Sequence, residues 1–76
     1  MSKAVPSVTG NEAIAAFGKI GYGLDRIRGS HHILKHPEKT NHLSIPVHGS
    51  KPVGRGLLRS QIRAAGISVD EFIDLL

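Results

Sequence analysis

The sequence predicts an α+β domain in which a small three-stranded antiparallel sheet carries its helices on one face, in the order α-β-β-β-α with a short C-terminal helix. Three features predict it: capped helical stripes on both sides of the central segment, the β-branched residues of that segment (residues 22–47), and two turn sequences that cut it. A three-stranded sheet in water must cover its apolar side, so the helices are expected to share one face and leave the other open.

The first helix is expected over residues 10–18. Thr9 and Glu12 have the Thr-x-x-Glu spacing of a capping box, in which a hydroxyl and a carboxylate satisfy the free amides of a helix start. Apolar residues then recur at helical spacing, and Gly18 or Gly21 can end the helix in a left-handed conformation. This helix therefore has one apolar side to bury.

Three strands are expected within residues 22–47, with turns at residues 29–30 and 37–41. The third strand is the clearest, because apolar and polar residues alternate strictly over residues 43–48. Pro46 cannot donate a hydrogen bond to a neighbouring strand, which favours an edge position or a strand end.

Two further helices follow Gly54. The second helix has an apolar stripe that Gly66 ends, and its three arginines lie four residues apart on one face. The last helix, Val69 to Leu75, begins at another capping-box spacing and has acidic residues in its first turn, where the helix dipole favours them. The stripe of the second helix comprises Leu57, Leu58, Ile62 and Ala65.

The composition leaves room for one small domain. The chain has 76 residues and a net charge of +4, so residues 9–76 are expected to form a single domain and residues 1–8 a flexible tail. The absence of Cys excludes disulfides and thiolate zinc sites, and no apolar run suits a signal peptide or a membrane span, so a cytoplasmic location is expected. Residues 1–65 carry a net charge of +7 and residues 66–76 carry −3. This division is typical of a protein that binds a polyanion on one face, and equally of an ordinary solvated surface of mixed charge.

Five histidines lie in the strand region, and histidine is the side chain best suited to moving protons near neutral pH. A metal site is a poor alternative. On a strand, His32 and His36 are about 13 Å apart, whereas zinc needs each ligand nitrogen within about 2.1 Å. Neither a metal nor a cofactor is therefore expected. His36 and His42, beside the second turn, are expected to be surface or half-buried residues of the sheet with a structural and not a catalytic role.

His31 and His32 are adjacent on a strand and must point to opposite faces. If the residue numbers paired across the second hairpin have an odd sum, His32 turns inward and His31 and Lys35 turn outward. An even sum would put Lys35 on the apolar face. A buried unpaired lysine costs more than a buried neutral histidine, so the odd register is favoured, and His31 then shares the open face with His48.

An exposed histidine beside cations suits the cleavage of RNA. The ribose 2′-hydroxyl is a nucleophile that the substrate itself carries, so one base can start the reaction without a metal or cofactor. Neighbouring cations would hold the phosphates and offset the developing charge. Tyr22 could either stack on a base or lie in the core.

Several short segments carry a pattern that is specific in its order and spacing: Gly21-Tyr22, Arg28-Gly29-Ser30-His31-His32, His36-Pro37, Ile45-Pro46-Val47-His48, Gly56-Leu57-Leu58-Arg59-Ser60, Ala65-Gly66 and Glu71-Phe72. Together these segments resemble the HicA (YcfA-like) toxin family. The resemblance covers nearly the whole chain from Asn11 onward, and it implies a fold like that of double-stranded-RNA-binding domains, ribosome-independent cleavage of mRNA, and a HicB antitoxin that masks the active site. The catalytic histidine of the family carries over onto His31 or His32. The chain departs from the family at Leu57, where a small polar residue is usual, and in a hairpin loop that is one residue longer.

The resulting hypothesis is a toxin of a type II toxin–antitoxin system that cleaves mRNA without a metal, with His31 or His32 as the catalytic general base. The alternative is a non-catalytic RNA-binding module of the same fold, and a third reading makes the apolar last helix a protein-interaction surface. The expected partners are RNA and a HicB-type antitoxin, with a homodimer or a hetero-oligomer left open. The residues expected to contact RNA are Arg26, Arg28, Ser30, Lys35, His48, Arg55 and Arg59.

Overall fold

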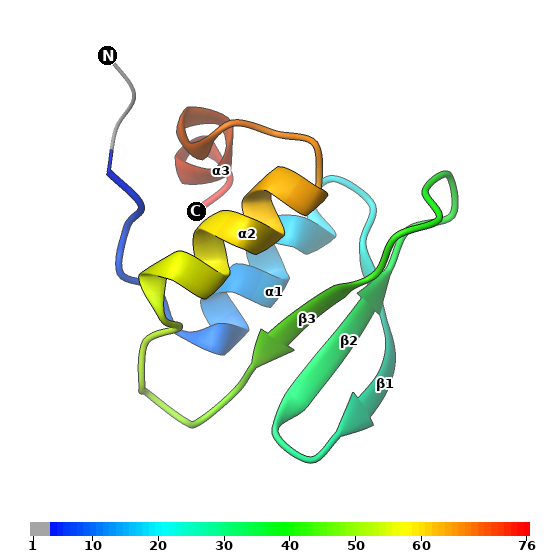
Figure 1. Cartoon of the computed structure of the whole chain (residues 1–76), viewed down its shortest axis with the longest axis horizontal. Helices are drawn as coiled ribbons and strands as arrows, with labels where there is room; N and C mark the ends of the chain where they lie inside the picture. Colours follow the sequence, from blue (N-terminus) through cyan, green and yellow to red (C-terminus); the bar gives the residue numbers. More distant parts are fainter. Residues whose placement is uncertain (1–3) are drawn as a thin grey trace.

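The computed structural model describes residues 4–76 and has the predicted order of elements (Figure 1). The three strands form one antiparallel sheet in the order β1-β2-β3, so the predicted α+β class is confirmed. The elements are α1 (Gly10–Gly18), β1 (Gly23–Arg28), β2 (His31–Lys35), β3 (Leu43–Pro46), α2 (Arg55–Ala64) and α3 (Val69–Asp74).

Both predicted capping boxes are present. The Thr9 hydroxyl accepts the Glu12 backbone N–H at 3.2 Å, and the Glu12 carboxylate accepts the Thr9 N–H at 2.8 Å. Ser68 and Glu71 form the same pair of bonds at the start of α3, each 3.0 Å long. These bonds satisfy amides that a helix start leaves free, which is why α1 and α3 begin where the sequence predicts.

The pairing of β2 with β3 has the odd register. Leu34 pairs with Leu43, and both side chains are buried. Lys35 points away from the helices and its side chain is 61% exposed, so the predicted orientation is confirmed. Strand β3 lies at one edge of the sheet and ends at Pro46, as expected for a residue that cannot donate to a ladder.

Helix α2 buries three of the four residues of its predicted stripe. Leu58, Ile62 and Ala65 are buried, whereas Leu57 is 39% exposed. Gly66, with a φ of 78°, follows the helix and provides the left-handed stop that the sequence predicts.

The helices pack on β3 and do not extend over the whole sheet. In Figure 1, α1 and α2 lie beside β3, and β1 is the strand farthest from them. All six residues of β1 are exposed. Leu24 and Ile27 point to the helix-facing side of the sheet, yet each is 54% exposed. The helices were expected to cover one whole face of the sheet. They cover this face at β3 and leave it uncovered at β1.

The hydrophobic core joins both ends of the chain. The Phe17 ring in α1 contacts Phe72 in α3, with centroids 5.1 Å apart, and meets Tyr22 edge-on at 6.1 Å. Tyr22 is 5% exposed, so it is a core residue and does not offer a ring for stacking on a base. The largest fully buried side chains are Phe17, Phe72, Leu34, Leu43, Ile45, Leu58 and Ile62.

The sequence predicts a flexible tail over residues 1–8, of which residues 1–3 lie outside the described residues. Val5 and Val8 are each 4% exposed and belong to the core. The Val53 N–H donates to the Val8 carbonyl at 2.8 Å. Residues 5–8 are therefore packed against the domain.

Candidate functional site

A two-residue turn at the tip of the first hairpin places a cation beside a histidine. Gly29 has a φ of 62°, which costs glycine nothing and lets the chain reverse at Gly29-Ser30. The turn pairs Arg28 directly with His31. Directly opposed residues of antiparallel strands have Cβ atoms about 5 Å apart, so the Arg28 and His31 side chains leave the sheet side by side on the same face.

The two adjacent histidines lie on opposite faces of β2, as predicted. His31 is exposed on the face away from the helices, and His32 is half-buried on the helix-facing side between Ile27 and Ile45. The Nδ1 atom of His32 is buried and has no hydrogen-bond partner among residues 4–76. Because Ile27 is largely exposed, the sheet is open to solvent beside His32 as well. Both histidines therefore border the surface.

The loop after β3 is tied to the same hairpin turn. The Val47 N–H donates to the Ser30 carbonyl at 2.8 Å, which brings the exposed His48 close to the turn. The Lys51 N–H donates to the His48 carbonyl at 3.1 Å, closing a second tight turn. Lys51 is a candidate RNA contact that was not predicted from the sequence. The turn signal at Gly49-Ser50 could have indicated it.

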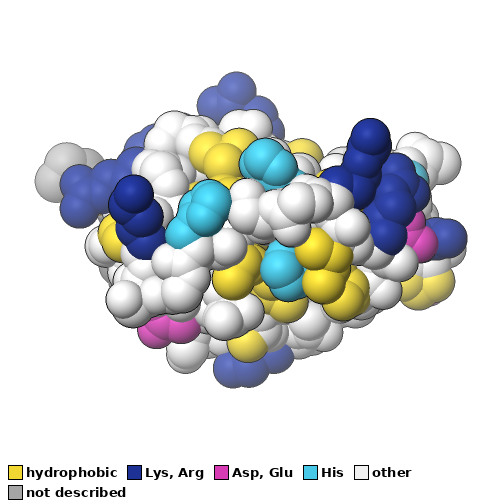
Figure 2. Space-filling view, turned by 90° about the horizontal axis from the view of Figure 1, so that it is seen from below, with side chains coloured by type: hydrophobic (Ala, Val, Ile, Leu, Met, Phe, Trp, Pro, Cys, Tyr) yellow, Lys and Arg dark blue, Asp and Glu magenta, His cyan; other side chains and the backbone are white. Residues whose placement is uncertain are grey.

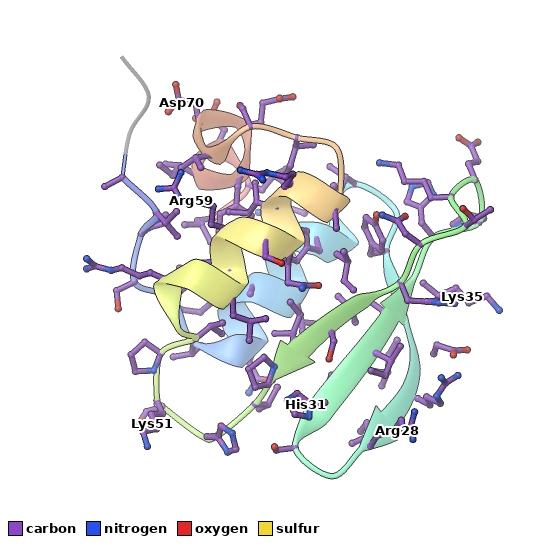
Figure 3. The ribbon with its side chains drawn as sticks, viewed as in Figure 1. Arg28, His31, Lys35, Lys51, Arg59 and Asp70 are labelled. Atoms are coloured by element: carbon purple, nitrogen blue, oxygen red, sulfur yellow. The ribbon has the colours of Figure 1, made fainter. Side chains whose placement is uncertain are left out.

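These side chains lie at the same end of the molecule. In Figure 3, His31 lies between Arg28 and Lys51 at this end. Figure 2 views the end face-on and shows histidine side chains gathered there with hydrophobic side chains between them and Lys and Arg at both margins. A surface of imidazoles between cationic margins is suited to a polyanion such as RNA.

Two of the predicted RNA contacts lie farther along the sheet. Asp25 forms a bulge in β1 and pairs with Arg26 at 3.0 Å, and the Lys35 ammonium lies 4.0 Å from the same carboxylate. Lys35 shares the outward face with His31 but is about 13 Å away along β2. Asp25 also offsets part of the charge of these two cations.

The arginines of α2 form a separate group. Arg55 and Arg59 are exposed, and Figure 3 shows Arg59 on the opposite side of the molecule from Arg28. The predicted RNA contacts are thus divided among three places. Arg28, Ser30 and His48 lie at the hairpin end, Arg26 and Lys35 lie farther along the sheet beside Asp25, and Arg55 and Arg59 lie on the outer surface of α2.

His36 has the structural role expected for it. Its Nε2 atom lies 2.9 Å from the Ile20 carbonyl, and its Nδ1 atom accepts the Glu38 N–H at 3.0 Å. Its ring also meets Tyr22 edge-on, with centroids 5.0 Å apart. Since both ring nitrogens are engaged, His36 joins the loop after α1 to the loop after β2.

Within residues 4–76, no three His, Cys, Asp or Glu side chains come close enough to hold a metal ion together. Over that range, no helix is both long and apolar enough to cross a membrane.

Comparison with protein-family models matches residues 10–67 to a family described as the HicA toxin of bacterial toxin–antitoxin systems. A comparison with curated proteins gives no match. The matched residues extend from the start of α1 to just beyond α2, so they contain the whole sheet and both adjacent histidines, whereas α3 lies outside them. Because the match covers most of the chain and the fold agrees with it, the chain belongs to the HicA toxin family.

Proposed function

We propose that this HicA-family toxin cleaves mRNA without a metal ion and uses His31 as the general base. Membership of the family supports the coarser part of the proposal: a toxin with endoribonuclease activity, an RNA substrate and a HicB-type antitoxin. The finer part rests on the pairing of His31 with Arg28, which sets an exposed imidazole directly across from a cation.

The proposed reaction needs no group that the protein and RNA do not supply. The His31 imidazole takes the proton of a ribose 2′-hydroxyl, and the 2′-oxygen forms a bond to the adjacent phosphorus. The bond from phosphorus to the next 5′-oxygen breaks, and that oxygen takes a proton from His48. The products are a 2′,3′-cyclic phosphate and a 5′-hydroxyl. Arg28 offsets the charge that develops on the phosphate.

His32 is the second candidate for the base. It lies on the opposite face of β2, where RNA would approach past Ile27 and not past Arg28. Its buried Nδ1 atom leaves Nε2 as the nitrogen available to a substrate. The two candidates therefore predict different RNA contacts, and single substitutions distinguish them.

The test is cleavage of RNA by the purified protein in EDTA. His31→Ala is expected to lower the rate by about 10²–10⁴-fold, whereas His32→Gln keeps measurable activity. His42→Ala is the matched control, because His42 is an exposed histidine in the loop between β2 and β3. Wild-type cleavage by the His31→Ala/His32→Ala variant, or loss of cleavage in EDTA, would show the mechanism to be wrong. Binding that weakens with salt while the RNA stays intact would favour the non-catalytic RNA-binding module.

A further inference from the structure

The two edges of the sheet differ in how they are covered. At β3, the Ser44 N–H donates to the Gln61 side chain of α2 at 2.9 Å, and Gly10 of α1 lies against the Pro46 backbone. At β1, no segment within residues 4–76 pairs with the outer edge. Backbone N–H and C=O groups along such an edge are a template for another strand.

Strand β1 also exposes apolar side chains beside this edge. Leu24 and Ile27 are each 54% exposed on the helix-facing side, where the helices do not reach. A shallow pocket of about 320 Å³ adjoins Leu24 and has room for a side chain of a bound segment. It is lined by Gly21, Gly23, Leu24, Asp25, Lys35 and Pro37. The outward face of the same strand carries Arg28 and Arg26, and Asp25 offsets part of the charge of Arg26.

We propose that the HicB-type antitoxin adds an extended strand to the outer edge of β1. The strand directs apolar side chains toward Leu24 and Ile27 and acidic side chains toward Arg26 and Arg28. Main-chain hydrogen bonds supply the affinity, and the alternation of apolar and acidic residues supplies the specificity. The inference rests on the proposed function for the identity of the partner.

The charges of β1 favour the antitoxin over a second copy of the chain. Two β1 strands paired antiparallel about a two-fold axis would bring the arginines of both copies onto one face. Like charges facing each other across paired strands are destabilising, and Asp25 is the only acidic residue of the strand. An acidic partner strand turns the same arginines into attractive contacts.

Strand addition at β1 also gives a physical route to inhibition. Adjacent strands lie about 4.8 Å apart, so the added strand would be about 10 Å from β2. Its acidic side chains would engage Arg28, the cross-strand neighbour of His31, and its apolar side chains would cover Ile27, the neighbour of His32. One strand would thus compete with RNA on both faces of the hairpin.

Amide hydrogen exchange tests the strand itself. The probe is a purified HicB-type antitoxin. Exchange of the amides in residues 23–28 is expected to slow at least tenfold in the complex, because the added strand accepts hydrogen bonds from this edge. Unchanged exchange in β1, the absence of a complex, or equal protection by an RNA oligonucleotide or by self-association would each overturn the inference.

Leu24→Ser tests the side-chain contact, and Leu76→Ser is the matched control. Leu76 is 50% exposed and follows the last helix, the element that the alternative hypothesis of a protein-interaction surface would assign to a partner. Leu24→Ser is expected to weaken the binding of the antitoxin about 10–100-fold, from the apolar contact that it loses, and Leu76→Ser less than about twofold. RNA cleavage by the free Leu24→Ser toxin stays at the wild-type rate. An equal effect of both variants, or none at Leu24, would overturn the inference.

Different experimental results would contradict the proposed function and the proposed docking site. If the antitoxin protects β1 but the free protein leaves RNA intact, the proposed function fails and the docking site stands. If the free protein cleaves RNA but Leu24→Ser binds the antitoxin like the wild type, the docking site alone fails.

Discussion

Gly10 gives the sharpest test of how α1 is held against the sheet. It is the first residue of α1 and is buried at the end of β3. A Cβ atom at this position would lie 2.3 Å from the Pro46 carbonyl oxygen and 2.8 Å from a methyl carbon of Val47. The Pro46 oxygen belongs to the backbone and cannot rotate away, so Gly10→Ala must push α1 and β3 apart.

The expected cost follows from this clash. Inserting atoms into a packed core costs about 1–3 kcal/mol, and a chain of this length has a total stability of about 4–11 kcal/mol. For a domain of this size, each kcal/mol shifts Tm by about 4–8 °C. Gly10→Ala should therefore lower Tm by about 4–24 °C.

Thermal and urea unfolding measure the effect, with Gly18→Ala as the control in the same helix. A Cβ atom at Gly18 meets nothing within 4 Å, and alanine is favoured over glycine in helices by about 1 kcal/mol. Gly18→Ala should thus match or exceed wild-type stability. Wild-type stability of Gly10→Ala would refute the close approach of α1 to β3 on which the reasoning depends.

Three further predictions concern polar groups. Burial raises the pKa of the Tyr22 hydroxyl. Ionisation of Tyr22 therefore does not change the free energy of unfolding at pH values below the pKa of an unfolded tyrosine, about 10, and it lowers this free energy as the pH rises above that value. Urea titrations at alkaline pH, with tyrosinate absorbance reporting on the single tyrosine, should show this loss in the wild type and not in Tyr22→Phe. At neutral pH, Tyr22→Phe should be unchanged or about 1 kcal/mol more stable, because its buried hydroxyl has no partner among the described residues. His36→Ala removes two hydrogen bonds and should cost about 1–3 kcal/mol, against less than about 0.5 kcal/mol for the exposed His42→Ala, both by urea unfolding. Gln61→Ala leaves the Ser44 N–H without its acceptor and should cost about 1–3 kcal/mol in the same assay; no change would mean that water replaces the bond.

Local chemistry explains which parts of the fold could be predicted from the sequence. The capping boxes at Thr9 and Ser68 are formed by residues three positions apart, and so they are visible without a fold. The register of β2 was predictable because a one-residue slip would have buried Lys35. The same register set His31 and His32 on opposite faces.

The position of the helices was not predictable in this way. It depends on contacts between distant residues, such as Gly10 with Pro46 and Gln61 with Ser44, for which no local pattern exists. These contacts hold the helices at β3 and leave Ile27 exposed. They also separate the arginines of α2 from the hairpin, a division that charge counting along the chain could not reveal.

Phe72 has a consequence for the lifetime of the toxin. It is 0% exposed and packs on Phe17, although α3 lies beyond the residues matched to the family. Losing a buried phenylalanine costs about 3–5 kcal/mol, which is a large share of the stability available to so small a domain. A protease that cuts at residues 67–68 would therefore remove much of the stability of the domain without touching its histidines. The resistance of the toxin to degradation is then expected to depend on α3, far from the proposed chemistry.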